Sequence, residues 1–198
     1  MNAQRKRLKF VLAAGLAALA LAPLSAGEVF KIDPGHSSIL FKVTHFNVSQ
    51  VYGRFNQFEG SIDYDGQNPS AMKVNLVIKA ESVDTAQERR DKHLRSPDFF
   101  NANQFGDITF TSTKVESAGE GEYHITGDLT ILGVTKSVSA HIKETGSGDH
   151  PRGGFLRGFS GTATIKRSDF NMSYGLDSGA LSDEVDLIFS FETARQDS

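Results

Sequence analysis

Histidine is the side chain in this sequence best suited to acid–base chemistry or metal binding near neutral pH. The six histidines are His36, His45, His93, His124, His141 and His150. No two of them form a close metal-ligand pair, and the HExxH motif of zinc enzymes is absent. The chain also has no cysteine, which excludes thiol chemistry and cysteine-based metal sites. We therefore predict no metal site.

The sequence patterns of other catalytic sites are also missing. There is no GxSxG elbow, no phosphate-binding loop and no GxGxxG that opens a helix. The adjacent carboxylates Asp183 and Glu184 lie beside an expected turn, where water is their simplest partner. We predict no catalytic residue and no cofactor, and expect a protein that is not an enzyme. An enzyme acting on an apolar substrate, with His45 or His93 as its acid–base residue, is the alternative.

His45 has the most informative position among the histidines. It follows Ile39, Phe41 and Val43 at alternate positions, so the four side chains share one face of an expected strand, the inward face. One interpretation is an interior histidine that is hydrogen bonded near the strand end. The other is a polar contact for the head group of a ligand at the mouth of a barrel.

A second polar group gathers in the segment 82–96, which lacks alternation and is highly charged. Thr85 followed by Glu88 fits a capping box, and Pro97 is a natural stop. These signals predict a short helix over residues 86–95. Its surface is polar nearly all round, so we expect it on the outside of the fold or across a barrel mouth.

The basic side chains of this helix allow two interpretations. They can form a solvated face with pairs inside the helix. They can also form a cationic rim for a ligand head group, for which Arg90 and His93 are the candidates. Three phenylalanines, Phe99, Phe100 and Phe105, follow the helix and either plug one end of the fold or line an entrance to it.

The elements that must position these residues are strands. From residue 28 onward apolar and polar residues alternate in runs separated by short turn signals, and we count about eight such runs. The expected turns are Asp65-Gly66, Gly119-Glu120-Gly121, Leu132-Gly133 and the segment from Gly146 to Gly154. The long run 51–64 predicts either a bend near Gly60 or a strand covered on both sides. The pattern predicts an all-β fold, an eight-stranded antiparallel barrel with a short helix near one end; a two-sheet sandwich is the alternative.

The first 26 residues have the layout of a secretory signal peptide. Four basic residues precede an apolar run from Phe10 to Leu21, which is shorter than the roughly 20 residues that span a membrane. We predict cleavage after Ala26, with an N-terminal anchor helix as the alternative. The domain then covers residues 27–198, and the chain is not expected to be an integral membrane protein.

The charge balance of the mature chain excludes one class of partner. Removing the four basic residues leaves 17 Lys and Arg against 24 Asp and Glu, a net charge near −7. Because affinity for nucleic acid comes mainly from neutralising phosphates, we expect no nucleic-acid partner. A homodimer is left open.

The interior is expected to be rich in phenylalanine, because 14 of the 15 phenylalanines follow Ala26 and the chain has no tryptophan. Phenylalanine has no polar group that needs a partner, which favours an apolar interior. An eight-stranded barrel can be filled by its own side chains or can hold one small ligand. The residues alone leave both alternatives open.

Several segments in order resemble the YceI-like family. They are residues 30–37, 41–46, 53–55, 58–60, 90–100, 108–110, 127–136 and 167–171. Together they span nearly the whole mature chain, and 90–100, Arg-Asp-Lys-His-Leu-Arg-Ser-Pro-Asp-Phe-Phe, is the most specific. Asn171 stands where the family pattern often has glycine.

The resemblance implies a lipocalin-like, extended barrel in the bacterial periplasm that binds a polyisoprenoid, an isoprenoid quinone or another long-chain amphiphile. The sequence hypothesis is therefore a binding protein that carries or sequesters such a chain; a filled barrel that serves as an interaction or stress-response protein is the alternative. The ligand-binding candidates are Phe41, Val43, His45, Phe55, Leu76, Ile78, Phe99, Phe100, Phe105, Phe110, Ile125, Leu129, Phe159 and Phe189.

Overall fold

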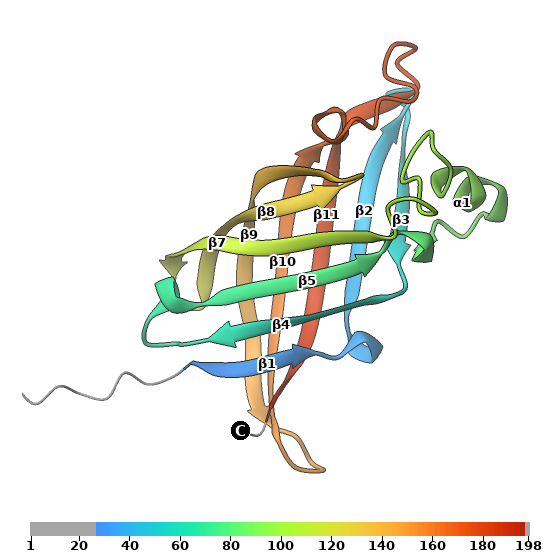
Figure 1. The fold of residues 1–198 in the computed structure, drawn as a ribbon. Coiled ribbons are helices and arrows are strands. Elements are labelled where there is room, and N and C mark those ends of the chain that lie inside the picture. Colours follow the sequence, from blue (N-terminus) through green and yellow to red (C-terminus); the bar gives the residue numbers. More distant parts are fainter. Residues whose placement is uncertain (1–26, 197–198) are drawn as a thin grey trace, which may run out of the picture.

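The computed structural model describes residues 27–196, and the predicted signal peptide lies outside the described residues. Figure 1 shows strands that wrap around one axis, with a short helix beside one end. The strands are β1 (Glu28–Ile32), β2 (Ser38–His45), β3 (Ser49–Phe55), β4 (Phe58–Tyr64), β5 (Lys73–Lys79), β6 (Val83–Asp84), β7 (Asp107–Gly119), β8 (Glu122–Ile131), β9 (Val134–Asp149), β10 (Phe155–Lys166) and β11 (Leu181–Arg195). The helices are α1 (Glu88–Leu94) and the short 3-10 helices η1 (Pro34–His36), η2 (Pro69–Ala71), η3 (Ala80–Ser82) and η4 (Arg167–Phe170).

The strands close into a barrel. Neighbours pair in the order β1-β4-β5-β7-β8-β9-β10-β11, and β1 also pairs with β11, so eight strands form a ring. All of these pairings are antiparallel. The predicted eight-stranded antiparallel barrel is confirmed, and the two-sheet sandwich is wrong because the ring leaves no break between two sheets.

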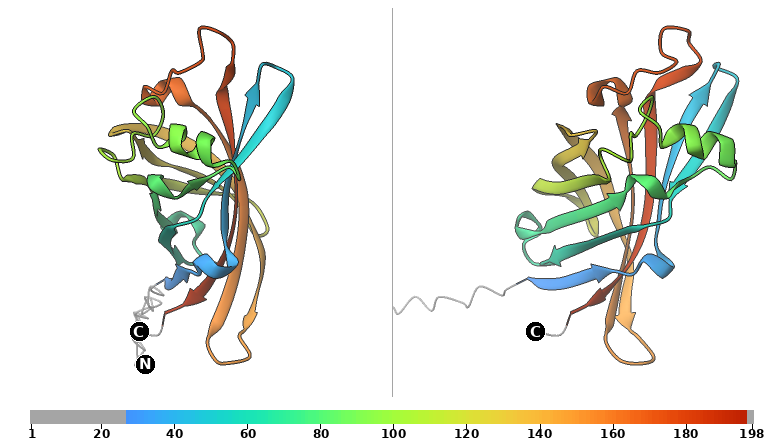
Figure 2. Two further views of the ribbon diagram at one scale, coloured as in Figure 1. Left: turned by 90° about the vertical axis from the view of Figure 1, so that its right-hand side faces the viewer. Right: turned by 45° about the vertical axis from the view of Figure 1, so that its right-hand side comes forward.

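The remaining strands, β2, β3 and β6, extend the sheet at one end of the barrel. The chain is interrupted between β1 and β2, between β3 and β4, and between β5 and β6. Beyond these interruptions β2 pairs with the N-terminal part of β11, β3 pairs with β2, and β6 pairs with β3. The β2–β3 hairpin consequently projects from one end of the barrel, as both views in Figure 2 show. The predicted bend at Gly60 is wrong. The break lies at residues 56–57, and Gly60 sits inside β4, where a Cβ would lie 2.4 Å from the Asn75 carbonyl oxygen.

Helix α1 is shorter than predicted and is capped by a different residue. Ala86 has a left-handed backbone (φ 57°), so the helix cannot start before Gln87. The Gln87 side chain caps it by accepting a hydrogen bond from the Arg90 amide. The predicted capping box at Thr85 and the predicted bounds 86–95 are therefore wrong, although the helix does end before Pro97.

Turn chemistry explains the other connections. Leu132 and Gly133 both have positive φ (54° and 73°), the conformation that suits a two-residue hairpin turn between β8 and β9. The turn predicted from Gly146 onward begins later, because β9 stays paired to Asp149, opposite Phe155. Asn171 ends η4 with φ 61°, a left-handed conformation that asparagine tolerates and glycine adopts freely.

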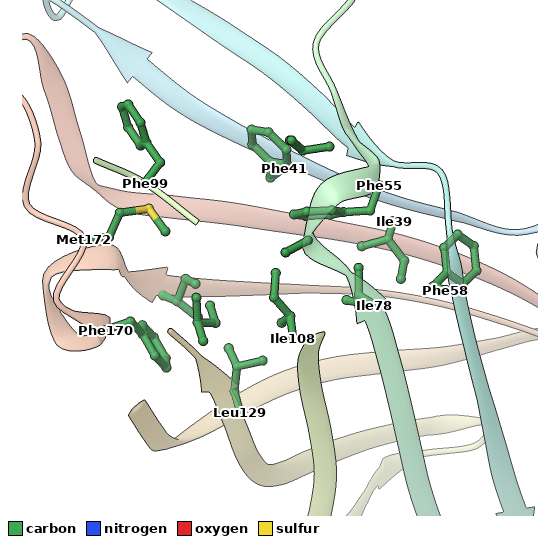
Figure 3. Packing of buried hydrophobic residues seen from close by; sticks show 14 of the residues in the cluster. Ile39, Phe41, Phe55, Phe58, Ile78, Phe99, Ile108, Leu129, Phe170 and Met172 are labelled. Carbon is green, nitrogen blue, oxygen red and sulfur yellow. The ribbon is translucent and has the colours of Figure 1, made fainter. Parts of the chain in front are cut away.

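The buried side chains form two clusters along the barrel axis. The larger one includes Phe41, Phe55, Ile78, Leu129 and Phe170, which Figure 3 shows from β2, β3, β5, β8 and η4. The smaller one consists of Ile62, Met72, Val115, Tyr123, Ile125 and Phe159. The apolar interior of the barrel is therefore divided into two parts, and each part is packed by a different set of side chains.

Candidate ligand-binding cavity

The end with the larger cluster contains a cavity of about 460 Å³, within the range of small-molecule sites. The lining residues are Ile39, Phe41, Val43, His45, Val51, Phe55, Ile78, Thr85, Arg90, His93, Leu94, Phe99, Phe100, Ile108, Leu129, Ile131, Ile165, Arg167, Phe170, Met172, Tyr174, Ala180, Leu181, Val185 and Leu187. All but six of these side chains are wholly apolar, so the cavity suits an apolar molecule with one polar end.

The other end of the barrel is filled, and Phe110 marks the boundary. Its ring packs against both clusters. It also takes the space in front of Gly127, where a Cβ would lie 2.4 Å from a ring carbon. Phe189 covers Gly161 in the same way, with a ring carbon 2.5 Å from the position of a Cβ. Glycines on the inward face thus make room for both rings inside the barrel, and the ring of Phe110 separates the hollow end from the filled end.

A buried ion pair closes the filled end. Arg157 pairs with Glu144, and both side chains are about 85% buried, at 14% and 16% exposed. The Arg157 guanidinium lies 4.0 Å from the ring centre of Tyr64, whose hydroxyl donates to Glu144 at 2.9 Å. Burial raises the pKa of Tyr64, and its hydrogen bonds with Tyr123 and Glu144 raise it further. Turn residues around this pair form a second hollow of about 550 Å³ that is polar, so it does not suit an apolar chain.

Arg167 builds one wall of the cavity. It is 4% exposed, and its guanidinium donates hydrogen bonds to the carbonyl oxygens of Met172 (3.0 Å), Tyr174 (2.8 Å), Leu181 (3.3 Å) and Ser182 (2.8 Å). Burial lowers the pKa of Arg167. One side chain thereby fixes the loop 171–180 over the cavity.

Helix α1 is held at the cavity mouth by its inward carboxylate. Asp91 is buried and accepts hydrogen bonds from the amide (2.8 Å) and the hydroxyl of Thr85. Arg90 donates from Nε to the same hydroxyl at 2.7 Å and from a terminal nitrogen to the Thr85 carbonyl at 2.8 Å. Asp91 therefore points inward and fixes the helix to the segment before it. Arg90 is thus held in place at the cavity rim.

His93 connects the helix to the two other segments around the mouth. Its Nε2 lies 2.8 Å from a carboxylate oxygen of Asp98. Its ring meets Phe99 and Tyr174 edge to face, with centroids 5.0 and 4.9 Å apart. The imidazole is therefore held in one orientation beside the cavity.

His45 also lines the cavity, but it is exposed at the end of β2. Its ring contacts Phe46, with centroids 4.5 Å apart. The interpretation of His45 as an interior histidine is wrong, because β2 leaves the body of the barrel before this residue. A polar contact at the mouth stays a prediction.

The structure brings together ten of the sixteen residues predicted for ligand or head-group binding. They are Phe41, Val43, His45, Phe55, Ile78, Phe99, Phe100, Leu129, Arg90 and His93, and all line the cavity.

The other six predicted residues lie away from the cavity. Ile125 and Phe159 belong to the filled end. Leu76 pairs across β5 and β7 with Phe110 at the boundary. The remaining two are Phe105, which lies against Gly133 at the β8–β9 turn, and Phe189, which stacks on Phe191. Alternation places a side chain inside the barrel, but it does not say at which level along the axis.

Sequence reasoning missed the wall built by Arg167, Phe170, Met172 and Tyr174. These residues show no alternation, because η4 and the loop 171–180 are irregular. The signal that could have found them is Arg167, which begins the segment 167–171 that resembles the family pattern. Its partners are backbone carbonyls, which sequence does not reveal.

Within residues 27–196, one group of side chains has the geometry to hold a metal ion. Ligand atoms of Asp33, His36 and Glu192 lie within 4.8 Å of one another. His36 Nδ1 is already 2.8 Å from Asp33, and the imidazole is largely exposed. The hydrogen bond to Asp33, with the Coulombic attraction of Asp33 and Glu192, raises the pKa of His36. The group fastens η1 to β11 and lies outside the cavity.

Among the described residues, no helix has both the length and the apolar character needed to cross a bilayer.

A sequence model of the YceI-like domain matches residues 30–193. A UPF0312 protein of Pectobacterium carotovorum is 44% identical over 192 residues, which cover 97% of this chain and 98% of that protein. A UPF0312 protein of Pseudomonas aeruginosa is 47% identical over 189 residues, covering 91% of this chain and 97% of the relative.

Solved structures show the same architecture. The YceI protein of Campylobacter jejuni is 35% identical, with a TM-score of 0.70 over 78% of this chain and 90% of that one. BcnA of Burkholderia cenocepacia is 24% identical, with a TM-score of 0.75 over 81% and 98% of the two chains. A domain of Saccharophagus degradans described as polyisoprenoid binding is 17% identical, with a TM-score of 0.63 over 84% and 98%. The last two show the fold alone.

Proposed function

The chain belongs to the YceI-like family, and we propose that it binds a long-chain apolar amphiphile inside its barrel and carries or sequesters it. The cavity of about 460 Å³ between β2, β8, β11 and the loop 171–180 is the observation that carries the proposal. A molecule enclosed there meets mostly apolar side chains, which fits a hydrocarbon and offers little to a polar solute. The Saccharophagus domain, described as polyisoprenoid binding, has the same architecture.

The volume of the cavity limits the part of the ligand that is enclosed. If each ligand carbon takes about the 30 Å³ of a water molecule in the liquid, then 460 Å³ holds about 15 carbons or more. Burial of each ligand carbon favours binding by about 0.8 kcal/mol. About 15 buried carbons therefore contribute about 12 kcal/mol to the free energy of binding, before the costs of association and ordering are subtracted. We infer that a polyprenyl tail much longer than this extends through the mouth, whereas a fatty acyl or sesquiterpenoid chain fits inside.

The mouth provides the polar contacts for a head group. Arg90 and His93 are held in place by Thr85 and Asp98, so they lose little freedom when a ligand binds. His45 lies at the same rim. A carbonyl, hydroxyl or acidic head group would accept hydrogen bonds from these donors, and binding of this kind needs no covalent chemistry.

We further propose that the protein works in the periplasm after cleavage behind Ala26. The basic and apolar layout of residues 1–26 supports this location. N-terminal sequencing of the exported protein is expected to begin at Gly27, and a retained Met1 would contradict the proposal.

Native mass spectrometry tests the binding function. Protein extracted without detergent is expected to carry a small molecule that organic solvent releases. The stripped protein is expected to rebind farnesol and geranylgeraniol, which differ by one isoprene unit. A ligand-free mass together with no rebinding of either alcohol or of a fatty acid would refute the proposal.

A further inference from the structure

Among residues 27–196, six large apolar side chains are exposed: Val29, Phe46, Val48, Tyr52, Tyr174 and Ile188. Four of them lie at the end of the barrel that holds the cavity mouth, whereas Val29 is in β1 and Ile188 is in the middle of β11. Phe46, Val48 and Tyr52 belong to the β2–β3 hairpin, and Tyr174 belongs to the loop 171–180. Phe46 is 57% and Val48 85% exposed, at the tip of the hairpin. Several apolar side chains that project this far into water at one place form the kind of surface by which proteins contact a partner or a membrane.

The backbone of the tip is strained at the exposed aromatic residue. Phe46 and Asn47 both have positive φ (49° and 54°), and the Val48 amide closes the turn on the His45 carbonyl at 3.0 Å. Such a turn favours Asn-Gly or Asp-Gly, because other side chains clash with their own backbone in this region. Phenylalanine is therefore a poor choice for the stability of the hairpin, and its exposed ring recovers little by burial. Unlike the other residues of this conformation, Phe46 combines a strained backbone with an exposed aromatic ring, a combination that a function would explain.

The same tip lacks charge. Residues 43–53 contain no Asp, Glu, Lys or Arg, although these types make up 23% of the chain. Lys42 and Arg54 flank this segment on the outer face of the hairpin. Residues 170–176, on the other side of the mouth, are also free of these four types. Charged groups are the ones that cost most to bring against a lipid phase, so their absence here matters.

The tip and the mouth are parts of one surface. The Phe46 amide donates to the Ala180 carbonyl at 2.9 Å, which ties the hairpin tip to the loop 171–180. Val43, Val51, Tyr174 and Ala180 line the cavity. Figures 1 and 2 show the hairpin and the loop projecting from the same end of the barrel, opposite the β9–β10 turn. A phase that receives the tip therefore faces the opening of the cavity.

We propose that the tip of the β2–β3 hairpin inserts Phe46 and Val48 into the surface of a lipid bilayer and so places the cavity mouth against the source or destination of its ligand. The inference rests on the proposed function for the identity of the cargo. A bilayer is favoured over a second copy of the chain because a stable protein interface buries about 800 Å² on each partner, far more than the apolar side chains of this tip offer. Docking is driven by apolar insertion, since a mature chain near −7 gains nothing from anionic lipid.

Tryptophan placed at the tip reports the insertion directly, because the protein has none of its own. The Phe46→Trp variant is expected to show a blue-shifted emission with phosphatidylcholine vesicles and quenching by brominated acyl chains. Adding phosphatidylglycerol is expected not to strengthen the response. Arg152→Trp, in the exposed β9–β10 turn at the opposite end, is the matched control and is expected to show no shift.

The Phe46→Asn variant separates docking from folding. Asparagine relieves the left-handed strain, so the hairpin stays folded and the melting temperature stays equal or rises. Vesicle binding is expected to weaken about tenfold, in line with the loss of one partly buried phenylalanine. Transfer of a fluorescent fatty acid from the protein to vesicles slows by a similar factor, while the amount of fatty acid bound in solution does not change.

Two outcomes would overturn the docking proposal directly: no vesicle-induced shift of the emission of Phe46→Trp, or unchanged vesicle binding of Phe46→Asn. A third outcome would overturn it by assigning the tip to a second copy of the chain: an emission shift of Phe46→Trp that appears without vesicles as the protein concentration rises. The proposed function fails separately. A protein that docks on vesicles but takes up no chain would refute the carrier function alone, and one that binds a chain but ignores vesicles would refute docking alone.

Discussion

Two isoleucines on one strand distinguish a hollow barrel from a filled one. Ile125 and Ile131 both point inward from β8 and are 3% and 6% exposed. Ile125 packs in the filled end, and Ile131 lines the cavity. We consider the same substitution at both positions, Ile125→Phe and Ile131→Phe, so that side-chain chemistry and strand are matched and only the surroundings differ.

The structure sets the size of each effect. Phenylalanine has three more side-chain carbons than isoleucine but two fewer hydrogens, so its compact ring adds only about 25 Å³, close to the volume of one ligand carbon at about 30 Å³. At position 131 that volume comes out of the 460 Å³ cavity and displaces about one ligand carbon. At about 0.8 kcal/mol for that carbon, the loss is about fourfold in affinity. At position 125 the same carbons have no space, and overpacking costs about 1–3 kcal/mol of folding stability.

Urea unfolding of ligand-stripped protein and titration with a fluorescent fatty acid measure the two effects. Ile131→Phe is expected to unfold at the same urea concentration as the wild type or a higher one, and to bind about fourfold more weakly. Ile125→Phe is expected to be less stable and, once folded, to bind as the wild type does. Equal destabilisation of both variants, with affinity unchanged in each, would show that the barrel is filled throughout and would refute the reasoning.

Two further predictions follow from the polar contacts. Arg167→Ala leaves the four carbonyls that Arg167 binds without their donor, so we expect a loss of about 3 kcal/mol or more in the free energy of unfolding and weaker ligand binding. Arg167→Lys keeps the positive charge but lacks the several N–H donors of the guanidinium, so it is expected to recover less than half of the lost free energy of unfolding, as measured with urea. Wild-type stability of Arg167→Ala would contradict this role. The hydrogen bonds from Lys42 and Thr164 lower the pKa of Asp186 in the folded protein. Because the ionised form favours folding, this contribution is present above the ordinary carboxyl pKa near 4 and is lost as pH falls below it. The melting temperature of the wild type, measured between about pH 2 and 6, is expected to fall toward low pH, and that of Asp186→Asn is expected to fall less steeply. An identical pH profile for the two proteins would contradict the assignment to Asp186.

Much of the fold follows from short-range pattern. The alternation of Ile39, Phe41 and Val43 predicts a strand with an inward face, and all three side chains line the cavity. The turn at Leu132-Gly133 follows from the conformation that a two-residue hairpin requires. By contrast, the start of α1 depends on the left-handed backbone of Ala86 and on the Gln87 cap, neither of which the pattern of residues 82–96 indicates.

The candidate site was less predictable than the fold. Ile125 and Leu129 lie on the same face of β8, yet one is packed in the filled end and the other lines the cavity. The difference comes from Phe110, whose ring occupies the space in front of Gly127 between them. Phe110 and Gly127 lie on neighbouring strands and are distant in the sequence, so their contact cannot be read from either segment alone.

The sequence by itself determined that the chain forms antiparallel strands with an apolar inner face, and its ordered motifs indicated the family. Both depend on which residues are near one another along the chain, where alternation and turn conformation act. Only the tertiary structure decided which end of the barrel is hollow, that Arg167 supports its wall, and that Phe46 projects beside its mouth. These features depend on where strands break and which rings meet across the barrel. Packing between residues far apart in the sequence determines these features, because the space available to a side chain inside a closed barrel depends on the side chains of the opposite strands.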